Sequence, residues 1–313
     1  MPVLTAIGDS QTAWDAGFAV RPSDMWPAVC AEHLGSEWIA RGFGISGDRT
    51  DQVLARIDAA QMHEVPTVAV PAVAVNDPGN QTTTQTRQNL QASVQSLRHR
   101  AVGRGAGYGT GVTVATPSAL PADGRLGERY VVMTDDSTTG GAAGWNTEHA
   151  ANITGSVAAD TNGFKLAVWE NRYPLAGEYG WGRVAKTGSA PSPFGVKKIM
   201  IVAPPYRNFT TAGDTPSSPS SANAVIRQAQ QDAVIAENTV VGGEPSVIFC
   251  DLYSFMRQRI VDGKDPDFTV VSYDQARSWH WTINNQHYSA YGHALQAQKV
   301  AADIRATWPS LFA

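Results

Sequence analysis

The spacing of apolar residues predicts strands that alternate with helices along most of the chain. Short continuous apolar runs that end in Gly, Pro or Asp indicate buried strands, whereas apolar residues at helical spacing with a Gly stop indicate helices. The run at 65–77 is apolar on both faces, which is typical of a central parallel strand. The expected strands lie within 3–9, 38–50, 65–77, 196–205 and 245–255, and the expected helices within 25–35, 50–62 (capped by Thr50 or Asp51), 81–100, 221–241 and 289–308. This order predicts a doubly wound α/β sheet.

The alternation is interrupted between residues 101 and 195. This segment is rich in Gly and Thr, carries short alternating apolar runs and lacks any long helical pattern. Such a composition predicts a small all-β domain inserted into a discontinuous main domain of residues 1–100 and 196–313. Residues 211–221 are rich in Ser, Thr, Pro and Gly and predict a loop near the top of the sheet.

Composition excludes several classes of partner. The 313 residues hold 24 Lys and Arg against 28 Asp and Glu, a net charge of -4 without a basic cluster, so we expect neither nucleic acid nor an anionic membrane as a partner. Apolar runs are too short for membrane insertion, and the N-terminus has no basic region that would indicate a signal peptide. We therefore expect synthesis in the cytoplasm, with action outside the cell or on a virion left open. Cys30 and Cys250 show no metal-ligand spacing and are interpreted as small buried hydrophobes, so no metal or organic cofactor is expected.

Candidate chemistry lies just beyond the predicted strands, where sites form in open α/β sheets. Ser10 follows the first strand, Gly47 the second and Asn76 the third, while His287 precedes the last helix. A serine on a tight turn can act as a nucleophile and a histidine can take and return its proton. Backbone N–H groups of Ser10 and Gly47 and the side-chain amide of Asn76 could stabilise the oxyanion that an ester forms. This set of residues matches acyl transfer from an ester.

These segments resemble the SGNH hydrolases, also called GDSL esterases or lipases. The stretch "GDSQT" at 8–12 is similar to the first block of that family, "ISGDRTDQVLARI" at 45–57 to the second, "VNDPG" at 75–79 to the third and "HYSAYGHA" at 287–294 to the last. The resemblance implies a flavodoxin-like sheet, Ser10 as nucleophile and His287 as base. It also implies an oxyanion hole of Ser10, Gly47 and Asn76, and a structural role for His293.

Two departures from the family pattern affect these expectations. Ala74 stands where the third block begins with Gly, and we expect its methyl group to be tolerated. Asn284 stands three residues before His287, where the family carries the acid of its triad. The side chain or the backbone carbonyl of Asn284 could orient the imidazole, and a remote carboxylate, Asp267 or Asp274, is the alternative.

Several candidates also have a purely structural interpretation. Gly47 could supply a left-handed turn alone, and Asn76 could cap the end of a strand. Asp9 is expected to anchor the turn by accepting hydrogen bonds from backbone amides. Three tryptophans, Trp14, Trp279 and Trp281, could line an acyl or sugar cleft or could pack as core and rim, and the sequence favours neither role.

The sequence leaves more than one function open. We predict a serine esterase that removes short acyl groups, acetyl above all, from O-acylated carbohydrate or similar small esters. The inserted segment, over about 112–186, resembles a module of bacteriophage tail proteins, which implies contacts with a virion, with glycans or with other copies of the chain. The alternative is a glycan-binding attachment protein of a virion that keeps the fold without turnover. An acyltransferase using the same residues is a third hypothesis.

Overall fold

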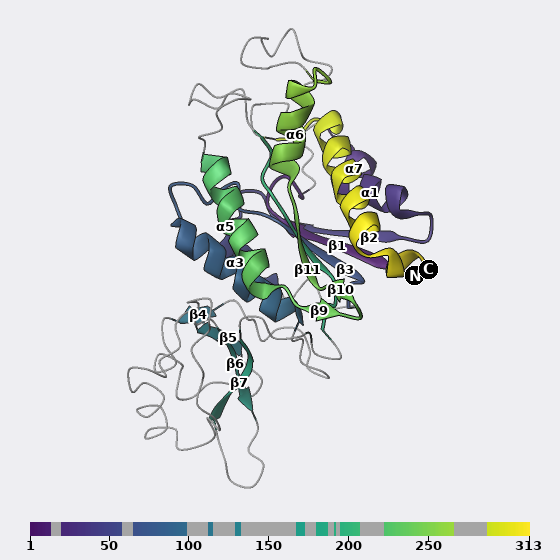
Figure 1. The fold of residues 1–313 in the computed structure, drawn as a ribbon. Helices are drawn as coiled ribbons and strands as arrows, with labels where there is room; N and C mark the ends of the chain where they lie inside the picture. The colour runs from purple at the N-terminus through teal and green to yellow at the C-terminus, as the bar shows by residue number, and fades with distance from the viewer. Residues whose placement is uncertain are drawn as a thin grey trace.

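The computed structural model describes residues 1–13, 20–57, 65–98, 191, 195–206, 222–265 and 287–313, together with the backbone of four strands between 112 and 186. Within these residues, five parallel strands form the central sheet (Figure 1). The strands are β1 (Val3–Gly8), β2 (Ile39–Gly44), β3 (Val68–Ala72), β8 (Ile199–Val202) and β11 (Val247–Cys250).

The strand order is β11-β8-β3-β1-β2. Counted along the chain, the five strands are therefore arranged 2-1-3-4-5, which is the order of flavodoxin-like sheets. The first strand and the third lie in the interior, and every residue of each is buried. This confirms the predicted doubly wound fold and the central position expected for the strand at 65–77.

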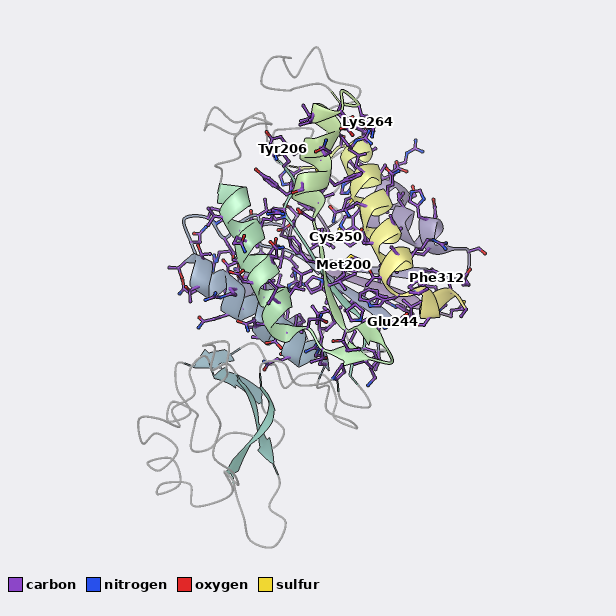
Figure 2. All side chains as sticks on the ribbon, viewed as in Figure 1. Met200, Tyr206, Glu244, Cys250, Lys264 and Phe312 are labelled. Carbon is purple, nitrogen blue, oxygen red and sulfur yellow. The ribbon has the colours of Figure 1, made fainter. Side chains whose placement is uncertain are left out.

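Helices cover both faces of the sheet because side chains alternate along each strand. On β1, Leu4 and Ala6 point into one apolar layer, whereas Ile7 points into the other. The first layer holds α1 (Trp26–Leu34), α6 (Leu252–Val261) and α7 (Ala290–Thr307), and the second holds α2 (Thr50–Ala55), α3 (Thr83–Arg98) and α5 (Ala222–Glu237). Met200 and Cys250, labelled in Figure 2, belong to the first layer.

Both cysteines are free and buried, as the sequence predicts. Burial raises the pKa of Cys30 to about 12, so its thiol stays protonated and unreactive. No helix among the described residues is long and apolar enough to span a membrane.

Three local expectations were wrong. The stretch 245–255 was predicted as a strand and its exit, but a helix, α6, begins at Leu252 because Asp251 caps it by accepting a hydrogen bond from the Ser254 N–H. The helix predicted to reach residue 241 ends at Glu237, and a Gly-Gly turn then joins β9 (Val240–Val241) to β10 (Glu244–Pro245). Neither Thr50 nor Asp51 caps α2, because Arg49 is its N-cap residue.

A separate four-stranded sheet lies in the segment that breaks the α/β pattern. Its strands are β4 (Val112–Val114), β5 (Arg129–Val132), β6 (Ala167–Arg172) and β7 (Gly180–Lys186). The segment leaves after α3 and returns before β8, where the Val196 N–H donates to the Leu97 carbonyl at 2.9 Å. These two points lie at the N-terminal edge of the central sheet, and Figure 1 shows the small sheet beyond that edge. The described strands therefore do not shield the opposite edge, where the candidate active site lies.

Candidate active site

The turn after β1 holds Ser10 in a compact loop. Backbone N–H groups of Thr12 and Ala13 donate to the Asp9 carbonyl at 3.0 and 2.9 Å, and the Gln11 N–H donates to Asp9 Oδ1 at 2.9 Å. Asp9 therefore anchors the turn through backbone amides, as the sequence predicts. Ser10 itself is only 7% exposed.

The end of β2 lies directly against this turn. An added Cβ on Gly44 would come within 2.1 Å of the Ala13 nitrogen, so a side chain at Gly44 would push the turn away. The Ile45 N–H donates to the Gly8 carbonyl at 3.1 Å and joins the second segment to the first. Glycine is thus needed here for close approach of two backbones.

Gly47 has a φ of 83°, in the left-handed region that favours glycine. The turn role expected for Gly47 is therefore present. The following residue, Asp48, connects this loop to the third segment, because its carbonyl accepts a hydrogen bond from Asn76 Nδ2 at 3.0 Å. An amide nitrogen carries two N–H groups, so one remains for another acceptor.

Buried hydrogen bonds hold the third segment in place. Asp77 is fully buried and accepts from the Thr50 N–H at 2.9 Å, from Thr50 Oγ1 at 2.6 Å and from Thr86 Oγ1 at 2.6 Å. Burial raises the pKa of Asp77, and these hydrogen bonds oppose that rise. Thr50, expected as a helix cap, instead ties α2 to the residue after Asn76.

Ala74 adopts a φ of 103° and is completely buried. A non-Gly residue with such a φ is strained, typically by about 1–3 kcal/mol. The methyl group is accommodated, as expected, but in a conformation that glycine adopts more easily.

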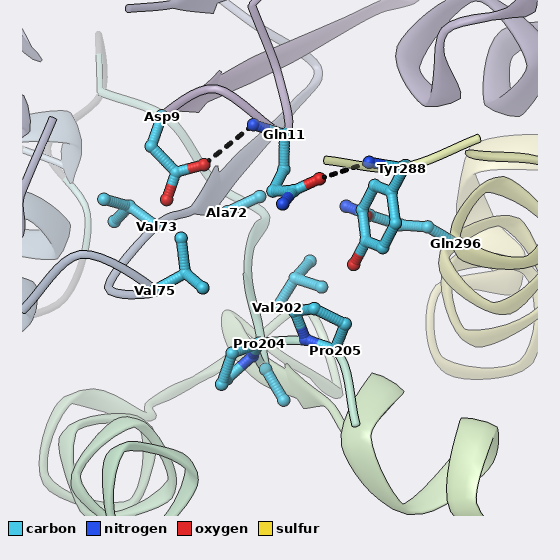
Figure 3. Close-up of a pocket in the computed structure, with 11 residues that line it drawn as sticks. Asp9, Gln11, Ala72, Val73, Val75, Val202, Pro204, Pro205, Tyr288 and Gln296 are labelled. Carbon is cyan, nitrogen blue, oxygen red and sulfur yellow. Dashed lines mark hydrogen bonds between the residues drawn. The ribbon is translucent and has the colours of Figure 1, made fainter. Parts of the chain in front are cut away.

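The last segment meets the first through Gln11. The Tyr288 N–H donates to Gln11 Oε1 at 3.1 Å, so the residue after Ser10 is bonded to the residue after His287 (Figure 3). His287 is partly exposed. The structure thus brings Ser10, Gly47, Asn76 and His287 to one edge of the sheet, each within two residues of a bond to another segment.

His293 lies inside the protein on α7. Its Nδ1 accepts a hydrogen bond from the Trp26 N–H at 3.3 Å, and its ring packs edge-on against Tyr288. Burial lowers the pKa of His293 to about 3, so the imidazole is neutral near pH 7. These contacts fit the structural role that the sequence implies.

A small hollow adjoins the nucleophile turn. Its volume is about 20 Å³, and the described residues around it include Asp9 and Gln11 from the turn, Tyr288, and the ends of β3 and β8 (Figure 3). Val75, next to Asn76, also lines it. The hollow therefore lies between the segments that carry the candidate residues.

Several sequence candidates lie outside the described residues. They are Asn284, the carboxylates Asp267 and Asp274, and the tryptophans Trp14, Trp279 and Trp281. Sequence reasoning in turn missed Thr50, Gln11 and Arg56, whose side chains join segments of the site. Arg56 was within the quoted second block, but nothing in its spacing indicated which carbonyls it binds.

The fold and site together define an α/β protein of flavodoxin-like order with a serine turn, a left-handed glycine loop, an asparagine and a histidine at the C-terminal edge.

No protein-family model and no curated protein matches the chain. Among solved structures, it is similar to a lipase/acylhydrolase from Enterococcus faecalis, with 14% identity, a TM-score of 0.48, and 98% of this chain and 96% of that chain covered. It is also similar to Est24, a carbohydrate acetylesterase from Sinorhizobium meliloti, with 11% identity, a TM-score of 0.45, and 98% and 99% covered.

A shorter match has a higher identity. AlinE4, an SGNH-hydrolase family esterase, is 27% identical over 32% of this chain and 55% of that chain, with a TM-score of 0.29. The case for a function therefore rests on the arrangement of the side chains.

Proposed function

We propose that the protein is a serine ester hydrolase that removes short acyl groups, acetyl above all, from O-acylated carbohydrate or similar esters. The observation that carries this proposal is the set of hydrogen bonds that joins the four segments at one edge of the sheet. The Ile45 N–H donates to the Gly8 carbonyl, and Asn76 Nδ2 donates to the Asp48 carbonyl. The Tyr288 N–H donates to Gln11 Oε1. These hydrogen bonds support a site in which a nucleophile, two kinds of oxyanion donor and a base act together.

In the first step, Ser10 Oγ forms a bond to the acyl carbon while its proton passes to His287. The carbonyl electrons move onto oxygen, and the oxyanion accepts hydrogen bonds from the Ser10 and Gly47 N–H groups and from Asn76 Nδ2. The bond to the alcohol oxygen then breaks, and His287 returns the proton to that oxygen. The product is an acyl group on Ser10 and a free alcohol.

In the second step, water attacks the acyl-enzyme. His287 takes a proton from the water as its oxygen bonds to the acyl carbon, and the same donors stabilise the second oxyanion. The bond to Ser10 Oγ breaks, Ser10 regains a proton from His287, and the acid is released. The residues named here supply each step without a metal or an organic cofactor.

Asn284 is proposed as the partner that orients His287. An amide oxygen or a backbone carbonyl can accept the imidazole N–H and fix the tautomer, although it leaves the positive charge uncompensated. Asn284→Ala separates the two, since a moderate loss of rate indicates the carbonyl and a loss of several orders indicates the side chain. If Asn284→Ala is nearly silent, loss of activity in Asp267→Asn or Asp274→Asn would indicate the remote carboxylate instead.

A short acyl group is the finer part of the proposal. The hollow beside the nucleophile turn is lined by Asp9, Gln11 and Tyr288, neighbours of the proposed nucleophile and base, so acyl-chain length is a direct probe of it. Cleavage of p-nitrophenyl acetate, butyrate and octanoate measures this preference, and we expect the rate to fall as the chain lengthens. An equal rate on octanoate would contradict it.

The central experiment compares wild type with Ser10→Ala on p-nitrophenyl acetate and on acetylated glycans. The exposed Ser23 provides a matched control, Ser23→Ala. We expect Ser10→Ala to lose hydrolysis and Ser23→Ala to keep it. Wild type that is no faster than Ser10→Ala on all substrates would refute the esterase.

The competing function is glycan binding without turnover, favoured by the asparagine where the acid is expected. This hypothesis predicts binding of an acetylated glycan by wild type and by Ser10→Ala, with no acetate released by either. Calorimetry of binding and an acetate assay on the same samples distinguish the two functions. Ester exchange with an added alcohol would instead indicate an acyltransferase.

A further inference from the structure

Arg56 binds three groups at the ends of two neighbouring strands. Its Nε donates to Asp48 Oδ2 at 2.6 Å, Nη1 to the Phe43 carbonyl at 2.7 Å and Nη2 to the Gly8 carbonyl at 2.7 Å. The side chains of Arg56 and Asp48 are 20% and 10% exposed. A mostly buried guanidinium thus joins the end of β1, the end of β2 and the loop that follows β2.

Two of these three acceptors lie close to a proposed oxyanion donor. Gly8 lies two residues before Ser10, and Asp48 follows Gly47 directly. The Asp48 carbonyl in turn accepts from Asn76 Nδ2. If the Asp48 backbone were displaced, the Gly47 N–H would move with it. The Asp48 carbonyl, which orients the Asn76 amide by accepting its hydrogen bond, would move as well.

Arginine suits this position better than lysine. Its planar guanidinium offers five N–H donors in a fixed arrangement, whereas an ammonium on a flexible stem cannot reach three separated acceptors with comparable geometry. The charge of Arg56 is matched by Asp48, so the effect on an oxyanion comes mainly from the position of the donors. Oxyanion stabilisation depends on donors that are held in place before the reaction.

We propose that Arg56 is a positioning residue for the oxyanion hole: it fixes the spacing of the Ser10, Gly47 and Asn76 donors by holding Gly8, Phe43 and Asp48. This inference rests on the proposed esterase function and assigns to Arg56 no contact with the substrate. Its loss should therefore weaken transition-state stabilisation with little effect on ground-state binding.

The test compares Arg56→Lys and Arg56→Met with Arg227→Lys. Arg227 also forms a two-bond ion pair, with Asp251 directly after the outermost strand β11, which two strands separate from β1, and provides the matched control. We expect kcat to fall about 10-fold in Arg56→Lys and about 100-fold in Arg56→Met, with KM within about twofold of wild type. Arg227→Lys should keep kcat within about twofold at a similar loss of thermal stability.

Two kinetic results would overturn the proposal. One is an unchanged kcat in both Arg56 variants, and the other is a loss of kcat no larger than that in Arg227→Lys at equal stability. A merely structural role would lower the folded fraction without changing kcat per folded molecule, which active-site titration with an organophosphate measures.

Nuclear magnetic resonance provides a second readout that does not depend on turnover. The side-chain amide of Asn76 and the N–H of Gly47 should shift in Arg56→Lys and stay unchanged in Arg227→Lys. Unchanged signals in Arg56→Lys would overturn the proposal even if wild type proved inactive. Wild-type hydrolysis that does not depend on Ser10 would instead refute the esterase function, while shifted signals would still support the positioning role.

Discussion

Gln11 Oε1 accepts the Tyr288 N–H at 3.1 Å, across 277 residues of sequence. This hydrogen bond joins the residue after the proposed nucleophile to the residue after the proposed base, and both partners are buried. A side chain that is not itself expected to react therefore contributes to the spacing between Ser10 and His287.

Substitution of Gln11 by Met tests this dependence. Methionine fills a similar volume but offers no comparable acceptor, so the buried Tyr288 N–H loses its partner at a cost of about 1–3 kcal/mol. We expect urea denaturation to show that loss and kcat to fall about 10-fold as His287 becomes less well placed.

Trp308→Phe is the control for this substitution. Trp308 Nε1 donates to the Pro245 carbonyl at 2.6 Å. Like the bond between Gln11 and Tyr288, this hydrogen bond joins a side chain to the backbone, but it lies near the N-terminal edge of the sheet, away from the candidate site. Trp308→Phe should lose comparable stability and keep kcat. An equal loss of kcat in both variants would mean that general destabilisation, rather than the position of His287, lowers the rate.

The strain at Ala74 predicts an unusual response to glycine. Ala74→Gly removes a buried methyl group and adds disorder to the unfolded chain, but it also relieves a φ of 103°. These effects nearly offset one another, so we expect the free energy of unfolding to change by less than about 1 kcal/mol.

Ala297→Gly provides the comparison, because Ala297 is equally buried but lies within α7. There the substitution loses the methyl group and the helix propensity without relieving strain, at about 1.5–2 kcal/mol. Equal destabilisation by the two substitutions, measured by urea denaturation, would show that Ala74 is not strained.

Periodicity predicted the sheet and most of its helices because these elements depend on which residues are apolar. It did not predict α6, although Leu252, Tyr253, Met256 and Ile260 follow helical spacing after the capping Asp251. The reason is that Asp251 alone separates the apolar strand from the apolar start of the helix. Local pattern thus identifies elements better than it separates adjacent ones.

For the site, the sequence placed Ser10, Gly47 and Asn76 correctly at the ends of strands. It could not predict the bonds from Gln11 to Tyr288, from Arg56 to Gly8 or from Thr50 to Asp77. Each joins residues far apart in the chain, so it depends on strand order and register rather than on local spacing.

The connection of the interrupting segment predicts that it can be removed. The Val196 N–H and the Leu97 carbonyl are hydrogen-bonded, so the two points of attachment are neighbours. A short Gly-Ser linker in place of residues 100–194 should therefore leave the main domain folded, with kcat on p-nitrophenyl acetate within about twofold of wild type.

Circular dichroism and the acetate assay check this outcome. Loss of the fold, or loss of kcat with the fold intact, would show that the segment supports the main domain or its active site. If hydrolysis is kept but binding to glycan or virion is lost, the segment carries the recognition role that the sequence led us to expect.

His293 predicts a dependence of stability on acid. Its pKa is about 3 in the folded protein because burial disfavours the imidazolium, whereas an unfolded histidine titrates near 6.5. Below pH 6.5 the unfolded chain therefore binds a proton that the folded protein does not, so this contribution to stability is complete above pH 6.5 and is lost as the pH falls toward 3.

The limiting slope from one such group is about 1.4 kcal/mol per pH unit. We expect His293→Gln to flatten the fall in unfolding free energy between pH 6 and 4, measured by urea denaturation. An unchanged slope in His293→Gln would mean that His293 takes up a proton in the folded protein as readily as in the unfolded chain.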